Sequence, residues 1–419
     1  MAEFEDILVV DIGSASVKAG FNGEDIPSSI FPSYVLPSGE KHPRTLESIE
    51  STGFRSDGSY DTNQPVQRGI VKDWDGIEKI YNMILNDLCI KTLENSSVMI
   101  VESTRATLID KAQLSQMLFE KFRVPSICFS NNGSCSIFAS GRTTGLVVDC
   151  GAGLTSTIPV FEGLALSHAI YTMEHGGQDV SAQLQKLLRE KKDGSIPITL
   201  PNAKLIKETY CRADTKYPKH AAPTDKEILY LPDGTEVQIE NRFFHECTIP
   251  IFKRVFNAPV HEKIHPAAIP PSGIVNQILE SWTLCDDSIK KDLIQNVIMA
   301  GGGSMLTGLN DAIGNELKIQ IDAHLNSKLQ SGSTFTPYES ILYPSNRHSE
   351  PGIYSFTSYR VIILHLTLTL PHSGYTNQRK FAPWIGGSIF SSLESYKQLH
   401  ITRQEWEESG DGVLLMKSF

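Results

Sequence analysis

The sequence has little of what disulfide-bonded, zinc-binding or nucleic-acid-binding proteins need. Its seven cysteines are dispersed and include no C-x-x-C pair, which argues against a disulfide framework or a zinc ribbon. The net charge is −10, and the longest basic cluster, residues 189–192, is short, whereas binding a phosphate backbone requires a clustered positive field. We therefore expect buried thiols in a reducing compartment and no direct nucleic-acid partner.

The sequence also shows no segment suited to export or to crossing a membrane. Its start, M-A-E-F-E-D, lacks the basic flank and apolar core of a signal peptide. The most apolar late run, residues 361–366, has about a third of the length of a membrane span. We predict a cytoplasmic protein, with the nucleus as an alternative, and no membrane partner.

The chain is long enough to form more than one hydrophobic core. It has 419 residues, of which 40% are hydrophobic and 21% charged. Because single cores stop growing near about 250–300 residues, we expect two lobes.

One short pattern occurs twice in the chain. Residues 7–10 form an apolar run that ends in D-I-G-S, and residues 145–148 form one that ends in D-C-G-A, 138 residues further along. Each run has the composition of a buried strand, and each is followed by a glycine turn and a second apolar run, at residues 17–21 and 154–161. We predict one β-hairpin with a glycine tip in each lobe, and hence a duplicated domain.

The rest of the chain alternates between helical and strand-like patterns. We predict helices at residues 74–88, 111–122 and 308–317 and strands at residues 97–101 and 297–299. This alternation is typical of mixed sheets flanked by helices, one in each lobe, with a cleft between them.

The two glycine tips carry the chemistry. If they face each other, their backbone N–H groups can bind one anion, which suits the β- and γ-phosphates of a nucleotide. Asp11 and Asp149 would repel those phosphates unless Mg²⁺ lay between, held by one or two carboxylates, phosphate oxygens and water. Lys18 can reach a phosphate across the first hairpin. A third glycine run, A-G-G-G-S-M at residues 300–305, lets the backbone pass close to a ligand.

At this point the chain resembles the actin family. The resemblance is carried by F-N-G-E-D at residues 21–25, R-G-I-V-K-D-W-D at 68–75, A-S-G-R-T-T-G at 139–145, W-I-G-G-S-I at 384–389 and the ending at 403–419. It implies a divergent actin-like or actin-related protein with an α/β, actin and Hsp70-like fold. That fold is a ribonuclease H-like duplication with two lobes and four subdomains around a nucleotide cleft.

The resemblance also implies how the subdomains divide the chain. The first comprises residues 1–32, 66–139 and 382–419, the second 33–65, the third 140–175 and 274–381, and the fourth 176–273. The third carries an insertion at about residues 320–378, interpreted either as a partner-specific loop or as a disordered insertion, because long surface insertions cost little stability. Within it, residues 361–370 alternate partly as a strand does.

The candidate nucleotide site combines the glycine turns with positions that match the family. Asp11 and Asp149 are the Mg²⁺ residues, acting through water, and ATP and Mg²⁺ are the implied cofactors. The family's adenosine contacts fall on Lys207 and Glu208, and its lysine beside the adenine falls on Lys380. The full predicted set is Asp11, Gly13, Ser14, Ala15, Lys18, Asp149, Gly151, Ala152, Gly153, Lys207, Glu208, Gly301, Gly302, Gly303, Ser304, Met305 and Lys380.

Hydrolysis depends on three further positions. The family positions its attacking water with a glutamine, an aspartate and a histidine, and this chain has Asn132, Ala152 and Ser156 there. Asn132 is the remaining catalytic candidate. Losing one well-placed polar group of this kind costs on the order of 10²–10³ in rate. The resemblance therefore implies at most a slow ATPase.

Five apolar residues match the family's partner cleft, where helices and neighbouring subunits dock. The spacing of its last three members is also that of a core helix, and both interpretations stay open. Residues 39–67 and 259–271 replace filament contacts of the family, which argues against ordinary self-polymerisation. The cleft residues are Phe138, Leu164, Ile389, Phe390 and Leu393.

The expected function is that of an Mg-ATP-binding cytoskeletal or complex-forming subunit. Its partners would be other proteins, including actin or actin-related subunits, bound through the cleft and the insertion. One alternative is a hydrolysis-competent, filament-forming actin, and another is a nuclear actin-related subunit of a chromatin-remodelling complex. A sugar or metabolite kinase of the same fold would need a carboxylate base where Ala152 stands.

Overall fold

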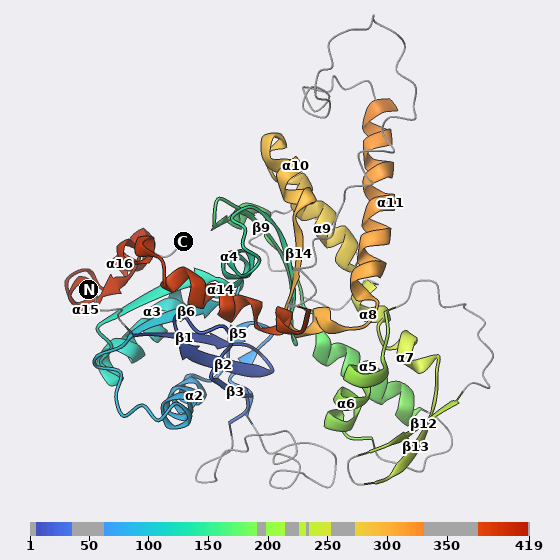
Figure 1. Ribbon diagram of the computed structural model, residues 1–419, viewed down its shortest axis with the longest axis horizontal. Helices are drawn as coiled ribbons and strands as arrows, with labels where there is room; N and C mark the ends of the chain where they lie inside the picture. Colours follow the sequence, from blue (N-terminus) through green and yellow to red (C-terminus); the bar gives the residue numbers. More distant parts are fainter. Residues whose placement is uncertain are drawn as a thin grey trace, which may run out of the picture.

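The computed structural model describes residues 6–35, 63–190, 198–213, 226–231, 234–252, 273–330 and 376–417. In the first lobe a mixed sheet has β1 near its centre, parallel to β6 and antiparallel to β2 (Figure 1). In order across the sheet, its strands are β15 (Ile401–Thr402), β7 (Ser126–Asn131), β6 (Ser97–Glu102), β1 (Ile7–Ile12), β2 (Ser16–Phe21) and β3 (Ser29–Pro32).

The second lobe repeats this arrangement. Here β8 is parallel to β14 and antiparallel to β9. The strands are β10 (Leu164–Ala165), β9 (Thr155–Phe161), β8 (Gly145–Cys150) and β14 (Val297–Ala300) in order, with β11 (Tyr171–Met173) also on β9. The two predicted hairpins and the duplicated α/β fold are thereby confirmed.

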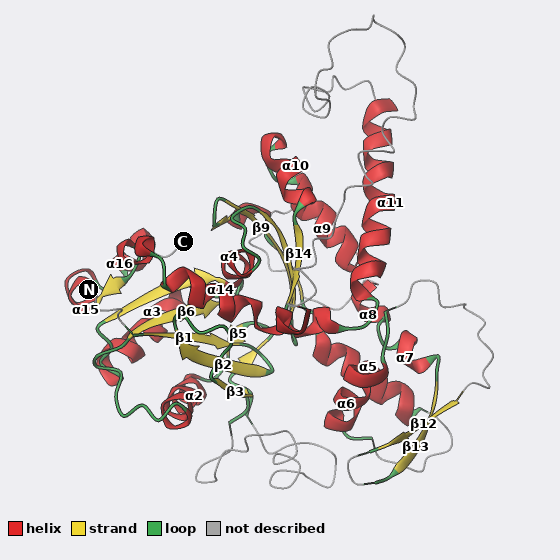
Figure 2. Cartoon of the chain, in the orientation of Figure 1, coloured by secondary structure: helices red, strands yellow, loops and turns green. Residues whose placement is uncertain are grey.

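Helices cover the sheets and connect the lobes (Figure 2). On the first lobe lie α2 (Trp74–Asp87), α3 (Leu108–Gln116), the π-helix η1 (Met117–Lys121), α15 (Arg403–Ser409) and α16 (Gly412–Lys417). The apolar face of α2 is buried as its periodicity predicts, with Ile77, Ile80, Tyr81 and Ile84 in the core beneath the sheet.

Two helices lie between the sheets and pack on each other: α4 (Asn132–Ala139) and α14 (Ala382–Ser391). Cys135 and Trp384 join a core with β1 and β6, while Ile137 and Ala382 join one with β8 and β9. The contact between α4 and α14 therefore contributes to the hydrophobic cores of both lobes.

The remaining elements belong to the second lobe and to the connections. The helices are α5 (Gly177–Arg189), α6 (Leu200–Tyr210), α7 (Phe243–Glu246), α8 (Ile249–Phe252), α9 (Gly273–Thr283), α10 (Asp287–Gln295) and α11 (Leu309–Gln330). Two hairpins are formed by β4 (Val66–Gln67) with β5 (Ile70–Val71) and by β12 (Lys226–Tyr230) with β13 (Glu236–Glu240). Short 3-10 helices are η2 (Ser167–Ala169), η3 (Gly302–Met305), η4 (Thr376–Phe381) and η5 (Glu394–Gln398).

Two predicted helix boundaries are wrong. The helix expected at residues 111–122 begins at Leu108, because Thr107 and Asp110 form a capping box, and its end is the π-helix η1. The helix expected at residues 308–317 continues to Gln330 as α11, which extends away from the body in Figure 1. The start of the predicted insertion thus prolongs a helix of the second lobe.

Other expectations fall partly or wholly outside the described residues. These are the strand at residues 361–370, the stretch at 259–271 and most of the stretch at 39–67. Of the helices in the described ranges, none has the length and apolar composition that crossing a bilayer requires.

Candidate functional site

The two hairpin tips have the same turn and face each other. In the first, the N–H of Gly13 donates to the carbonyl of Ser16 at 3.1 Å, and in the second the N–H of Gly151 donates to the carbonyl of Leu154 at 2.8 Å. A Cβ atom built on Gly153 would lie 3.2 Å from the Ser14 hydroxyl of the opposite tip. The two tips therefore approach each other so closely that any side chain at residue 153 would be tightly packed.

The carboxylates of the two tips lie close enough to influence each other. Lys18 Nζ contacts Asp11 Oδ2 at 2.9 Å across the β1–β2 ladder, with both side chains largely buried. Burial, and then the charge of Asp11, raise the pKa of Asp149 to about 6, while Lys18 and a hydrogen bond from Asn132 act in the opposite direction. The sequence-predicted pair of carboxylates therefore forms one electrostatic unit.

Asn132 completes this unit in a way that the sequence did not predict. It begins α4, and its Nδ2 donates to Asp149 Oδ2 at 2.6 Å. Its Oδ1 is buried without a hydrogen-bond partner among the described residues, so it is available to a donor such as metal-bound water.

The donor set fits a magnesium ion. In the described part of the chain no group of three or more His, Cys, Asp or Glu could enclose a metal, so a cation beside Asp11 and Asp149 would need further ligands such as water and phosphate oxygens. Mg²⁺ suits such a site, because it retains several waters and is held by one or two carboxylates with phosphate oxygens.

The third glycine run lies against the second tip. Gly301 has φ +79°, and a Cβ there would lie 2.3 Å from Asp149 Oδ1 and 2.5 Å from the carbonyl oxygen of Cys150. Gly302 has open space where its Cβ would be. Gly303 would collide with the Cys150 carbonyl, at 2.8 Å, and Ser304 closes the turn by donating to the Gly301 carbonyl at 2.7 Å. The run, which with Met305 forms η3, thus lines Asp149 with bare backbone.

The residues assigned to the adenosine differ in their placement. Lys207 is partly buried on α6, and its Nζ donates to the carbonyl of Gly177 at 3.0 Å. The N–H of Gly177 in turn donates to the carbonyl of Gly151, also at 3.0 Å, so Lys207 lies beside the second tip, where burial lowers its pKa. Glu208 and Lys380 are exposed, and neither has a hydrogen bond that draws it toward the tips in the described contacts.

The three positions assigned to hydrolysis carry no group that can take a proton near neutral pH. Asn132 is engaged with Asp149, and Ala152 has no polar side-chain atom. The buried Ser156 pairs with Thr104, their hydroxyl oxygens lying 3.0 Å apart.

The five residues assigned to a partner cleft form a partly exposed apolar surface. Leu164, Ile389 and Leu393 have exposed fractions of 56%, 41% and 44%. Phe138 and Phe390 are partly buried and stack on each other with ring centroids 5.3 Å apart. Most of α14 is buried, as a core helix would be, but the side chains of Ile389 and Leu393 are exposed.

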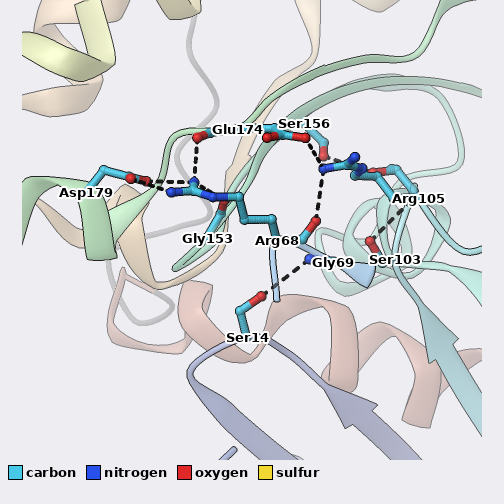
Figure 3. A network of polar contacts seen from close by, with 10 residues as sticks. Ser14, Arg68, Gly69, Ser103, Arg105, Gly153, Ser156, Glu174 and Asp179 are labelled. Carbon is cyan, nitrogen blue, oxygen red and sulfur yellow. Dashed lines mark hydrogen bonds and ion pairs between the residues drawn. The ribbon is translucent and has the colours of Figure 1, made fainter. Parts of the chain in front are cut away.

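Sequence reasoning missed a group of charged residues that joins the lobes (Figure 3). It consists of Arg68, Arg105, Glu174 and Asp179. One local signal was present: V-Q-R-G-I-V places an arginine in a two-residue turn, at a position that favours Asn, Asp or Gly.

A family model described as actin matches residues 3–204, 201–343 and 355–419. Together with the duplicated two-lobe fold, this match covers most of the chain, and the protein belongs to the actin family. Members of this family generally bind a nucleotide and a divalent cation and are usually cytoskeletal or cytoplasmic.

Proposed function

We propose that this actin-family protein binds Mg-ATP between its two hairpin tips and hydrolyses it poorly. The proposal rests on the closeness of the two tips and their aspartates. Gly153 of the second tip lies against Ser14 of the first, and the charge of Asp11 contributes to the raised pKa of Asp149. Paired carboxylates at two glycine turns suit a triphosphate only when a cation lies between them.

Each group has a distinct part in this binding. Asp11 and Asp149 would hold Mg²⁺ through its waters, with the orphaned Asn132 Oδ1 accepting from one of them. The bound ion supplies neutralisation of the phosphate charge. Lys18, which pairs with Asp11, would contact a phosphate, and the open space beside Gly302 would be available to the nucleotide.

Weak hydrolysis is supported by the contents of the water-positioning region. The amide N–H of Asn132 is hydrogen-bonded to Asp149, and the hydroxyl of Ser156 is hydrogen-bonded to Thr104. Ala152 has no polar side-chain atom. With no base available, ATP would act as a structural ligand that joins the lobes.

The proposed cellular role is that of a structural subunit in a cytoskeletal or other protein assembly. Its support is the exposed apolar surface of Leu164, Ile389 and Leu393 together with the Phe138–Phe390 stack. An exposed apolar surface of this kind suits an amphipathic helix or a neighbouring subunit.

Substituting Asp149→Asn tests the nucleotide site. We expect Mg-ATP affinity to fall about tenfold or more, because a charge-assisted contact to the hydrated ion is lost. Affinity for ATP in EDTA should instead rise, because one carboxylate no longer repels the phosphates. Isothermal titration calorimetry with and without Mg²⁺ measures both, and Asp110→Asn, on the outer helix α3, is the control. If wild-type protein binds no ATP under either condition, the proposal is wrong.

Substituting Ile389→Asp tests the partner surface. We expect recovery of stably bound partners, identified by affinity purification and mass spectrometry, to fall about tenfold or more, because a charge in the centre of an apolar interface is poorly solvated. Ile109→Asp is the matched control, since Ile109 on α3 is 72% exposed but lies outside this surface. Equal losses in both variants, or in neither, would contradict the assignment.

A further inference from the structure

A single arginine of the first lobe binds the second lobe through four hydrogen bonds (Figure 3). Arg68 lies at the tip of the β4–β5 hairpin, and its Nη1 donates to the carbonyl of Gly153 at 3.0 Å and to the carbonyl of Glu174. Its two terminal nitrogens also hold the carboxylate of Asp179, at 3.1 and 2.7 Å. This hydrogen bonding raises the pKa of Arg68 further, so the guanidinium stays charged.

Two neighbouring contacts cross between the lobes at the same place. Arg105 Nη1 contacts Glu174 Oε1 at 2.6 Å, with the arginine side chain only 12% exposed. Thr104 and Ser156 share a hydrogen bond of 3.0 Å. Arginines of the first lobe thus oppose carboxylates of the second.

The backbone at Arg68 is in an unfavourable conformation. Arg68 has φ +49° and Gly69 has φ +74°, which makes the β4–β5 connection a two-residue turn of the kind that favours Asn-Gly. A non-glycine residue in this region costs about 1 kcal/mol. Such a residue persists where its surroundings hold it, and here the contacts of the guanidinium do so.

We infer that Arg68 is an interlobe latch, which holds the lobes closed without nucleotide and limits how fast the site between the tips opens. The ion pair alone would contribute little, since the Arg68 side chain is 40% exposed. The latch is stronger than a surface pair for two reasons. The contact with Asp179 is bidentate, and the two carbonyl acceptors belong to backbone that is fixed in the second lobe.

The latch also reaches the proposed nucleotide site directly. Its acceptor Gly153 forms part of the second hairpin tip, and the N–H of Gly69 lies 3.4 Å from the Ser14 hydroxyl of the first tip. Breaking the contacts of the Arg68 side chain therefore removes a direct hydrogen bond to the second tip. For its effect on nucleotide release, though not on lobe closure, this inference rests on the proposed function.

The substitution Arg68→Asn distinguishes a role of Arg68 as a latch from a role confined to the turn. Asparagine suits the turn better than arginine, so a purely local role predicts unchanged or higher stability and an unchanged lobe arrangement. A latch instead predicts that in nucleotide-free protein the mean distance between the lobes increases and its distribution broadens. Fluorescence energy transfer measures it between a donor on Cys89, the exposed cysteine, and an acceptor placed by Glu227→Cys on the exposed surface of β12.

Nucleotide release provides the second measurement. We expect a fluorescent ATP analogue with Mg²⁺ to dissociate about tenfold faster or more from Arg68→Asn, as the loss of charge-assisted hydrogen bonds implies. Asp179→Asn should act in the same direction while keeping an oxygen that accepts from the N–H of Gly176, a capping contact of 2.8 Å. The matched control is Arg123→Ala, because Arg123 pairs only loosely with Glu94 within the first lobe, at 3.4 Å.

The outcomes distinguish the latch from the nucleotide site. If Arg68→Asn leaves the nucleotide-free interlobe distance at the wild-type value, the latch is refuted, whatever happens to nucleotide. If the distance grows but wild-type protein binds no ATP analogue, the latch stands and the proposed function fails. A distance change of equal size in Arg123→Ala would also overturn the inference.

Discussion

Gly386→Ala is expected to lower the free energy of unfolding by about 3 kcal/mol or more, the upper range for forcing extra volume into a packed core. A Cβ on Gly386 would lie 1.6 Å from the carbonyl oxygen of Cys135 and 2.3 Å from its carbonyl carbon. These are backbone atoms of α4, so no side-chain rotation can relieve the clash. Because α4 and α14 pack between the two sheets, moving them apart loosens both lobes. Urea denaturation followed by circular dichroism measures the change.

Gly412→Ala is the control for this substitution. Gly412 begins α16, and nothing lies within 4 Å of its built Cβ. There the change should be neutral or stabilising by up to about 1 kcal/mol, because alanine forms helix better than glycine. A Gly386→Ala protein that unfolds at the wild-type urea concentration would show that α14 does not approach α4 this closely.

The hairpins and their carboxylates could be predicted because their cause is local. Apolar runs at residues 7–10 and 145–148 fix two buried strands, and a glycine turn after each returns the chain antiparallel. The ladder then places Asp11 opposite Lys18 and Asp149 opposite Ser156, at the same spacing in both copies. Local pattern thus gave the register and the position of the acidic residues.

The contacts between lobes could not be predicted, because they join residues far apart in the chain. Arg68 and Asp179 are 111 residues apart, and nothing in the sequence around either residue indicates which residue it pairs with. Asn132 looked like a shortened water-positioning side chain, yet its amide contacts Asp149. The extension of α11 to Gln330 was missed for another reason, since residues from about 320 were assigned to the insertion although apolar residues recur at every fourth position, at Leu317, Ile321, Leu325 and Leu329.

Ser156 links the substituted hydrolysis positions to the contacts between the lobes. Ser156 occupies the position assigned to a histidine of the family, and its hydroxyl binds Thr104 of the opposite lobe. Because that hydroxyl oxygen shares a hydrogen bond with Thr104, the position contributes to the contact between the lobes. Under the proposed function, poor hydrolysis and a stable closed form would then have the same structural origin.

Restoring the family's residues should therefore restore the reaction. In the triple variant Asn132→Gln, Ala152→Asp, Ser156→His, we expect ATP hydrolysis to rise on the order of 10²–10³-fold, the effect of regaining well-placed polar groups around the attacking water. Phosphate release measured under single-turnover conditions tests this, and Asp149→Asn added to the triple variant should remove the gain by weakening Mg²⁺ binding. Calorimetry must show that the triple variant still binds Mg-ATP. If it binds ATP as wild type does and releases phosphate no faster, the three substitutions do not account for weak hydrolysis. The closed arrangement of the lobes would then be what limits hydrolysis, and adding Arg68→Asn to the triple variant should raise the rate.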